Sequence, residues 1–289
     1  MLFRPIRTLA DRFNTLQMGM VSSERVFQVL DTDASMHNSP NPSPIVIKGD
    51  IAFKNVWMAY NNEEWVLKDL SFTIKKGQTV AIVGATGSGK TTIINLINRF
   101  YEFNKGEILI DGISIKEYDV DQLRKNIAVV LQDVFLFSDT IANNVTLNDD
   151  SISINQIEEA AAAIGADTFI HQLPRGFNYN VMERGAMLSA GQRQLIAFIR
   201  AYLYQPSILV LDEATSSIDT ETELAIQKAI LTITKNRTSI IIAHRLSTIQ
   251  NADLILVLDK GKLMESGNHQ ELLKNKGIYR KLYEMQFQE

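Results

Sequence analysis

The chain has 289 residues, of which 45% are hydrophobic and 21% charged, as in a folded protein of one large or two small domains. This composition excludes a disordered, collagen-like or wholly coiled-coil chain, and the absence of cysteine excludes disulfides and thiolate metal sites. The net charge of −4 provides no overall basic field, so we expect no nucleic-acid partner.

Residues 5–30 predict one amphipathic helix. Apolar residues recur three or four positions apart between residues 5 and 30, beginning with Ile6, Leu9 and Phe13. Arginines interrupt the start, and no apolar run reaches the about 18 residues of a membrane helix, so we expect the chain as given to be soluble. Three prolines within residues 37–44 indicate a linker. We therefore divide the chain into a helical extension (1–36), a linker (37–48) and a folded domain (49–289).

The folded domain has the pattern of an α/β protein. Residues 51–60 and 66–74 read as antiparallel strands, and residues 254–258 and 262–265 as a closing hairpin. Four continuous apolar runs are typical of parallel strands buried on both faces: residues 79–83, 127–131, 208–211 and 239–243. Between residues 149 and 204 the pattern is helical. We expect a mainly parallel sheet with an antiparallel β subdomain and a helical insert.

The segment GATGSGKT, residues 84–91, indicates a phosphate-binding loop. It follows an apolar strand and precedes a helical pattern, which is the context this motif requires. Its glycines let backbone N–H groups surround a triphosphate, Lys90 reaches the β- and γ-phosphates, and the Thr91 hydroxyl holds Mg²⁺. The predicted nucleotide-binding residues here are Gly84, Ala85, Thr86, Gly87, Ser88, Gly89, Lys90, Thr91 and Thr92. The loop predicts nucleotide binding but does not indicate which class of nucleotide-binding protein this is.

Two adjacent carboxylates end the buried strand SILVLDEA, residues 207–214. Buried carboxylates are costly unless cations or reacting groups compensate them. We therefore assign Asp212 to Mg²⁺ and Glu213 to the attacking water as general base. An acidic N-cap of the next helix is the alternative interpretation.

From about residue 49 to the end, the chain resembles the nucleotide-binding domain of an ATP-binding cassette (ABC) transporter. LSAGQ, residues 188–192, is similar to the family signature LSGGQ, with Ala190 in place of a glycine. The resemblance implies that Ser189, Ala190, Gly191 and Gln192 bind the γ-phosphate of ATP held by a partner domain, so that two domains sandwich two ATP molecules. It also implies a P-loop NTPase core with a helical signature subdomain at about residues 133–204. We expect the extra methyl group of Ala190 to be tolerated.

Other family positions match in order along the chain. Gln132 resembles the glutamine that contacts Mg²⁺ and links the site to the membrane domain. His244 resembles the histidine that contacts the γ-phosphate and helps orient the water, and Asp219 resembles an aspartate that crosses the dimer interface. The resemblance therefore implies Glu213, His244 and Lys90 as catalytic residues, and Thr91, Gln132 and Asp212 as Mg²⁺ ligands.

An aromatic residue is expected against the adenine base. Tyr60 ends a predicted strand where the family carries that aromatic, and a base stacked on a ring contributes about 1–3 kcal/mol. Trp57 and Trp65 are nearby alternatives.

Two features resemble the exporter branch of the family. These are the stretch ERGAMLSAGQRQ, residues 183–194, and the lead helix, which looks like the cytosolic end of the last membrane helix. The resemblance implies an ATPase that drives export as part of a membrane transporter. Its partners are a second nucleotide-binding domain and a transmembrane domain of the same polypeptide, at the cytoplasmic face. An importer ATPase and a soluble non-transport ATPase are the alternatives. The transported substrate, an identical or different partner, and the status of Met1 stay open.

Overall fold

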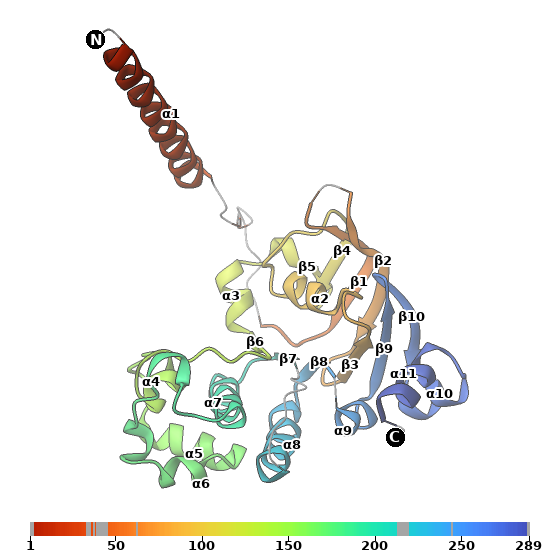
Figure 1. Cartoon of the computed structure of the whole chain (residues 1–289). Coiled ribbons are helices and arrows are strands. Elements are labelled where there is room, and N and C mark those ends of the chain that lie inside the picture. The colour runs from red at the N-terminus through yellow and green to blue at the C-terminus, as the bar shows by residue number, and fades with distance from the viewer. Residues whose placement is uncertain are drawn as a thin grey trace. The chain divides into compact units, whose positions relative to one another are not determined.

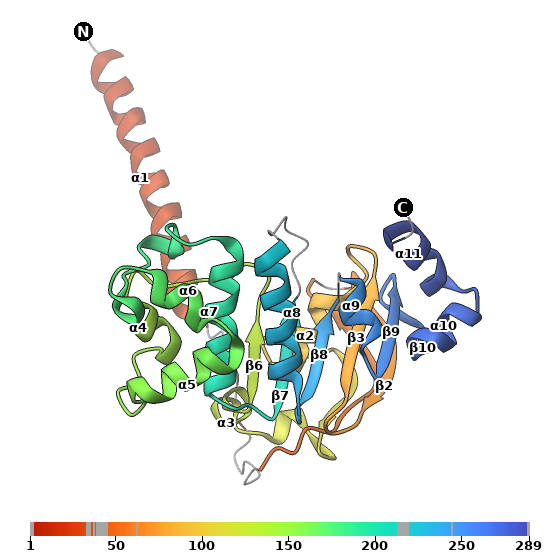
Figure 2. The ribbon, with the colours of Figure 1, turned by 90° about the horizontal axis from the view of Figure 1, so that it is seen from below.

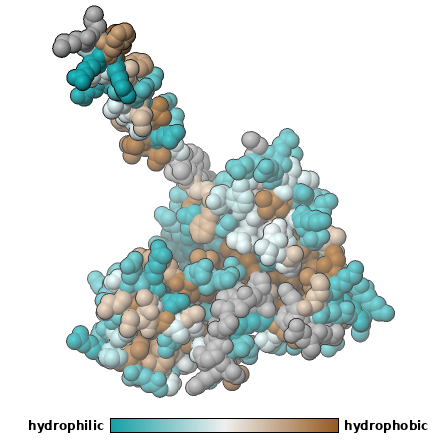
Figure 3. All heavy atoms as spheres, in the orientation of Figure 1, coloured by the Kyte–Doolittle hydropathy of each residue, from teal (hydrophilic) through white to brown (hydrophobic). Residues whose placement is uncertain are grey.

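The computed structural model describes the following residues: 3–32, 36, 38, 46–61, 63–212, 220–243 and 245–287. Contacts divide the chain into two units, residues 1–37 and 38–289. The first unit is the helix α1 (Phe3–Asp31), which buries none of its side chains. Apolar side chains are exposed along α1 (Figure 3), among them Phe13, Leu16 and Phe27. Within the described residues, neither α1 nor any other helix combines the length and the apolarity needed to cross a membrane.

The second unit begins with a four-stranded antiparallel sheet in the order β2-β1-β4-β5 (Figure 1). Its strands are β1 (Ile51–Ala59), β2 (Trp65–Ile74), β4 (Lys105–Ile110) and β5 (Ile113–Ser114). The predicted β1–β2 pair is present, with Ile51 opposite Ile74. Strands β4 and β5 were not predicted. They join the sheet because β4 pairs with β1, which lies about 50 residues earlier in the chain, and buries Ile108 and Ile110.

A six-stranded sheet in the order β10-β9-β3-β8-β7-β6 forms the centre of the unit. Its strands are β3 (Thr79–Gly84), β6 (Ile127–Val130), β7 (Ile208–Asp212), β8 (Thr238–Ile242), β9 (Leu254–Asp259) and β10 (Lys262–Gly267). All neighbours are parallel except β9 and β10. On β3, Val80 and Ile82 enter the core shared with the antiparallel sheet, whereas Ala81 and Val83 enter the core under the helices. Burial on both faces explains the continuous apolar runs, and the predicted α/β fold is confirmed.

Helices cover both faces of the parallel strands: α7 and α8 pack on one face (Figure 2), and α2 and α3 pack on the other. The α-helices are α2 (Lys90–Ile97), α3 (Val120–Lys125), α4 (Ile141–Thr146), α5 (Ile154–Ile164), α6 (Asp167–Gln172), α7 (Ala190–Leu203), α8 (Thr220–Thr234), α9 (Leu246–Gln250), α10 (His269–Lys274) and α11 (Ile278–Phe287). Short 3₁₀ turns are η1 (Ile115–Glu117), η2 (Gly176–Asn178) and η3 (Glu183–Gly185). Helices α4 to α7 form the helical insert. Within it α7 contacts α4 and α5, and α7 also contacts α8, which lies outside the insert.

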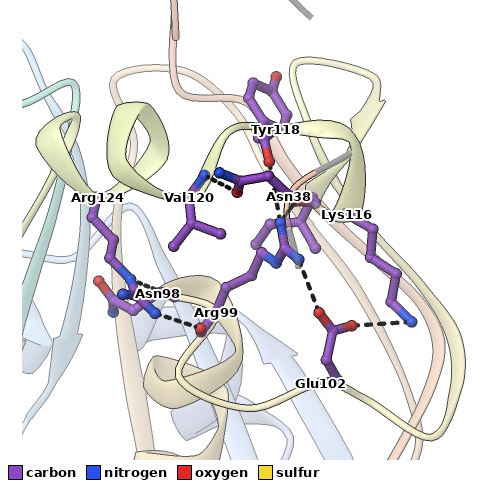
Figure 4. Close-up of polar contacts among 9 residues, drawn as sticks. Asn38, Asn98, Arg99, Glu102, Lys116, Tyr118, Val120 and Arg124 are labelled. Carbon is purple, nitrogen blue, oxygen red and sulfur yellow. Dashed lines mark hydrogen bonds and ion pairs between the residues drawn. The ribbon is translucent and has the colours of Figure 1, made fainter. Parts of the chain in front are cut away.

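A buried polar network joins the end of α2 to α3 (Figure 4). Arg99 is 3% exposed and donates hydrogen bonds to the carbonyl oxygen of Tyr118 (3.1 Å) and to the Glu102 carboxylate (3.0 Å). Arg124 of α3 donates to the carbonyl oxygen of Arg99 (2.8 Å). Because buried donors must be paired, these bonds fix α3, and with it β6, against the P-loop helix.

Asn38 is bound to the same helix. Its Nδ2 donates to the Asp119 carboxylate (2.8 Å), and its Oδ1 accepts from the backbone N–H of Val120 (2.9 Å). Asp119 itself caps α3 by accepting from the N–H of Gln122 (2.9 Å). The start of the second unit is thereby fastened to the helix that precedes β6.

Candidate functional site

The P-loop lies between the end of β3 and the start of α2, as predicted. Ala85, Thr86 and Gly87 are exposed, whereas Ser88 and Gly89 are buried. Gly89 has a φ of +102°, and a Cβ atom there would lie 2.6 Å from Leu67 Cδ2. A side chain at this position would therefore be both strained and in collision, which is why the motif needs glycine here.

Lys90 folds back over this loop. Its Nζ donates to the carbonyl oxygens of Gly84 (2.7 Å) and Ala85 (3.1 Å). Burial lowers the pKa of the Lys90 ammonium group, and the negative charge of Asp212 opposes that shift. The ammonium group thus sits at the mouth of the loop within the electrostatic range of Asp212.

Ser88 indicates how an anion would fit the loop. Its side chain is 2% exposed, and its buried Oγ has no hydrogen-bond partner among the residues that the structure describes. Buried hydroxyl groups are normally paired, so this one has an unused donor inside the loop. A phosphate oxygen would satisfy it, and the residues present therefore fit a nucleotide.

The oxygen donors expected for Mg²⁺ come from three elements. Thr91 is exposed in the first turn of α2, Asp212 ends β7 half-buried, and Gln132 is exposed just after β6. Parallel strands end at the same edge of a sheet, so β3, β6 and β7 deliver their following residues to one side. A hydroxyl, a carboxylate and an amide oxygen are suitable donors for this hard cation.

Several predicted residues fall outside the part of the chain that the structure describes. These are Glu213, Asp219 and His244. In the sequence, Glu213 comes after β7 and His244 comes after β8. These two strands are neighbours in the sheet, with Asp212 opposite Ile242. The roles of these residues stay predictions from the sequence.

Tyr60 lies at a cleft beside the P-loop. The cleft encloses about 730 Å³, and its lining includes Tyr60, Trp65, Val66, Gly87 and Lys260. The Tyr60 hydroxyl contacts Thr92 Oγ1 and Asn95 Nδ2, both at 3.1 Å, and its ring packs edge-on against Tyr101. These contacts hold the ring in place while leaving 41% of the residue exposed.

The two tryptophans differ in position. Trp65 shares this cleft with Tyr60. Trp57 packs against Trp65 at 5.4 Å between ring centroids, and Lys105 Nζ lies over both rings. Sequence spacing could not separate these aromatics, because all three lie within nine residues of one another.

The signature residues begin α7. Ser189 is its N-cap: the Ser189 Oγ accepts from the N–H of Gln192 (3.2 Å), and the Gln192 side chain accepts from the N–H of Ser189 (3.0 Å). This capping box places the free N–H groups and positive end of a 14-residue helix at the surface. Ala190 lines a second cavity of about 700 Å³ together with Gln132 and Arg184.

Among the described residues, the two cavities share no lining residue. The first brings Tyr60 to Gly87 of the P-loop, and the second brings Gln132 to Ala190 of the signature. Sequence reasoning missed Lys260 in the first cavity and the Asn95 and Tyr101 contacts that hold Tyr60. A lysine in the turn Asp259-Lys260-Gly261 was the available signal for Lys260.

Comparisons with known proteins all match one family. The ABC transporter family profile matches residues 67–216. The chain is 48% identical to a probable multidrug resistance ABC transporter ATP-binding/permease protein of Bacillus subtilis, covering 99% of this chain and 42% of that protein. It is 48% identical to an ATP-dependent lipid A-core flippase of Haemophilus influenzae, covering 99% of this chain and 49% of the flippase.

A solved structure matches over the same length. It is a bacterial Atm1-family ABC exporter with ATP bound, with a TM-score of 0.85 and 39% identity over 99% of this chain and 50% of that one. The chain thus spans about half the length of the relatives it matches.

Proposed function

The chain belongs to the ABC transporter family, and we propose that it is the ATP-hydrolysing nucleotide-binding domain of an exporter. The observation that carries this proposal is the P-loop, where Lys90 lies within electrostatic range of Asp212 and the buried Ser88 hydroxyl has no partner among the described residues. The similarity to exporters supports export over the importer and the soluble alternatives.

Nucleotide binding begins with an exchange of partners at Lys90. Its ammonium group donates to the carbonyl oxygens of Gly84 and Ala85, and it would donate to the β- and γ-phosphates instead once a nucleotide binds. The loop N–H groups and the N-terminus of α2 add positive potential at the same point. Tyr60 would stack on the adenine base.

Hydrolysis in this proposal depends on positioning and charge. Thr91, Gln132 and Asp212 would hold Mg²⁺, which when bound neutralises charge on the phosphate oxygens. Glu213 takes the proton of the attacking water, and His244 contacts the γ-phosphate and helps orient that water. Lys90 stabilises the charge that develops on the transferred group.

A second nucleotide-binding domain completes the site. The helix tip led by Ser189 is an anion site that lies apart from the cleft of its own chain. Two chains arranged head to tail would each present this tip to the γ-phosphate held by the other, with ATP between them. The partner is a second copy of this chain or a related domain.

The membrane half of the transporter is the other partner. We propose that α1 continues the last membrane helix into the cytoplasm, which would explain a helix with no buried side chain. ATP-driven closure of the dimer would then move the membrane domain and export a substrate. The names of the two curated relatives refer to multidrug resistance and to lipid A-core, both consistent with an apolar or amphipathic cargo.

The test replaces Glu213 with glutamine in the full-length transporter. We expect E213Q to bind MgATP and to lose hydrolysis by about 100-fold or more, because the general base is gone. E158Q removes the same charge from an exposed position on α5 and should hydrolyse ATP normally. Near-normal hydrolysis by E213Q would remove Glu213 from this role.

The sandwich can be tested on the chain itself. With saturating MgATP, light scattering of E213Q should give twice the 32.5 kDa of one chain. Replacing Lys90 with alanine in E213Q should abolish the dimer by removing the phosphate contact. If E213Q stays monomeric, both alone and within the full-length transporter, the shared-site proposal is wrong.

A further inference from the structure

The turn between β9 and β10 lies beside the P-loop. In the sheet, Gly84 of β3 stands opposite Leu258 of β9, so these two parallel strands end at the same edge of the sheet. Beyond that edge, the N–H of Gly261 donates to the carbonyl oxygen of Ser88 at 3.1 Å. The turn is therefore tied directly to the phosphate-binding loop.

The other side of the turn is fixed by β2. The carbonyl oxygen of Gly261 accepts from the N–H of Lys68 at 2.9 Å. A Cβ atom on Gly261 would lie 2.1 Å from the carbonyl oxygen of Val66, so the approach is too close for any residue but glycine. The position of Lys260, one residue earlier, is thus set by backbone contacts on both sides.

Lys260 occupies a position that does not suit lysine. Lys260 and Gly261 form a two-residue hairpin turn, with φ values of +46° and +81°. Turns with two positive φ values favour Asn-Gly, Asp-Gly or Gly-Gly, because other side chains are strained there. The backbone contacts on both sides hold this strained conformation in place, so the turn presents Lys260 at a fixed position.

Lys260 lines the nucleotide cleft together with Gly87 and Tyr60. The acidic lining residues Glu63 and Glu64 follow Tyr60 in its own loop. The two lysines of the lining, Lys68 and Lys260, lie instead where β2 meets the turn that is bonded to Ser88. Positive charge is therefore placed on the P-loop side of the cleft. Backbone groups of such a loop surround the α- and β-phosphates.

We propose that Lys260 is a nucleotide-binding residue whose ammonium group contacts the α- and β-phosphates of bound ATP. This inference rests on the proposed function and adds a binding residue that lies outside the recognised motifs. The contact is made from a strand hairpin about 170 residues after the P-loop. Because both phosphates are present in ADP, Lys260 strengthens the binding of ATP and ADP alike.

The test compares Lys260 with Lys262, an exposed residue of the same hairpin that does not line the cleft. K260Q and K262Q remove the same charge, so any difference between them is local. We expect K260Q to raise the Kd of MgADP, by calorimetry on the whole chain, about 3- to 10-fold. The KM for MgATP of the full-length transporter should rise by a similar factor with little change in kcat. K262Q should stay within about twofold of the wild type, and K260R should restore binding.

A second variant separates binding from folding. K260N introduces a residue that suits the turn, so its thermal midpoint should equal or exceed that of the wild type while its MgADP affinity falls as in K260Q. If K260N and K260Q bind MgADP as tightly as K262Q does, the inference is wrong and the proposed function stands. If the wild type itself fails to bind MgADP or MgATP, the proposed function is wrong.

Discussion

Replacing Tyr60 with alanine should weaken MgATP binding without unfolding the chain. Tyr60 is 41% exposed at the cleft, so removal of its ring leaves little empty space in the core. Its hydroxyl contacts Thr92 and Asn95, and its edge packs against Tyr101. These three contacts preset the ring for a planar ligand, which reduces the entropy lost when the base binds.

The size of the effect follows from stacking. A base on an aromatic ring contributes about 1–3 kcal/mol, which corresponds to a Kd about 5- to 150-fold higher in Y60A. Y60F keeps the ring and loses only the two hydroxyl contacts, so its Kd should rise no more than about threefold. Y60W should bind close to the wild type, because any flat aromatic face can stack.

The assay is calorimetric titration of the chain with MgADP, which avoids hydrolysis. W57A is the control, since Trp57 packs on Trp65 and leaves the Tyr60 contacts intact. A Kd for Y60A within twofold of the wild type would refute the stacking role. A larger loss in W65A than in Y60A would assign the base to Trp65, which shares the cleft.

Two further predictions concern stability. Asn38→Ala removes the hydrogen bonds to Asp119 and Val120, so the thermal midpoint of the chain should fall by about 2–4 °C, and an unchanged midpoint in calorimetry would contradict the anchoring of α3. Burial raises the pKa of Tyr279 to about 12, and its hydroxyl contacts His269 Nδ1 at 2.6 Å. An unfolded tyrosine ionises near pH 10. Neutral Tyr279 therefore contributes fully to the free energy of unfolding below that pH, and this contribution is lost between about pH 10 and 12. Denaturant titrations should show a smaller loss in Y279F than in the wild type, because Tyr118, whose pKa burial also raises to about 12, still ionises in that range; equal losses would refute the role of Tyr279.

The local patterns in the sequence were enough to predict most of the elements. Continuous apolar runs became the parallel strands, because each of those strands is buried on both faces. The P-loop was recognisable because its glycines, lysine and threonine are consecutive. The Ser189 N-cap was also readable, since a capping box involves residues only three positions apart. The pairing of β4 with β1 was missed, because nothing local specifies a partner about 50 residues away.

What the sequence determined by itself was therefore everything that short-range chemistry encodes: the fold class, the phosphate loop, the helix tip of the signature and the family resemblance. Only the tertiary structure decided which distant residues share a surface. The order β3-β8-β7 places Asp212 within electrostatic range of Lys90, the hairpin brings Lys260 to Gly87, and Asn38 reaches Asp119 across 81 residues. These contacts depend on sheet order and backbone hydrogen bonds between segments far apart in the chain, and no local spacing carries that information.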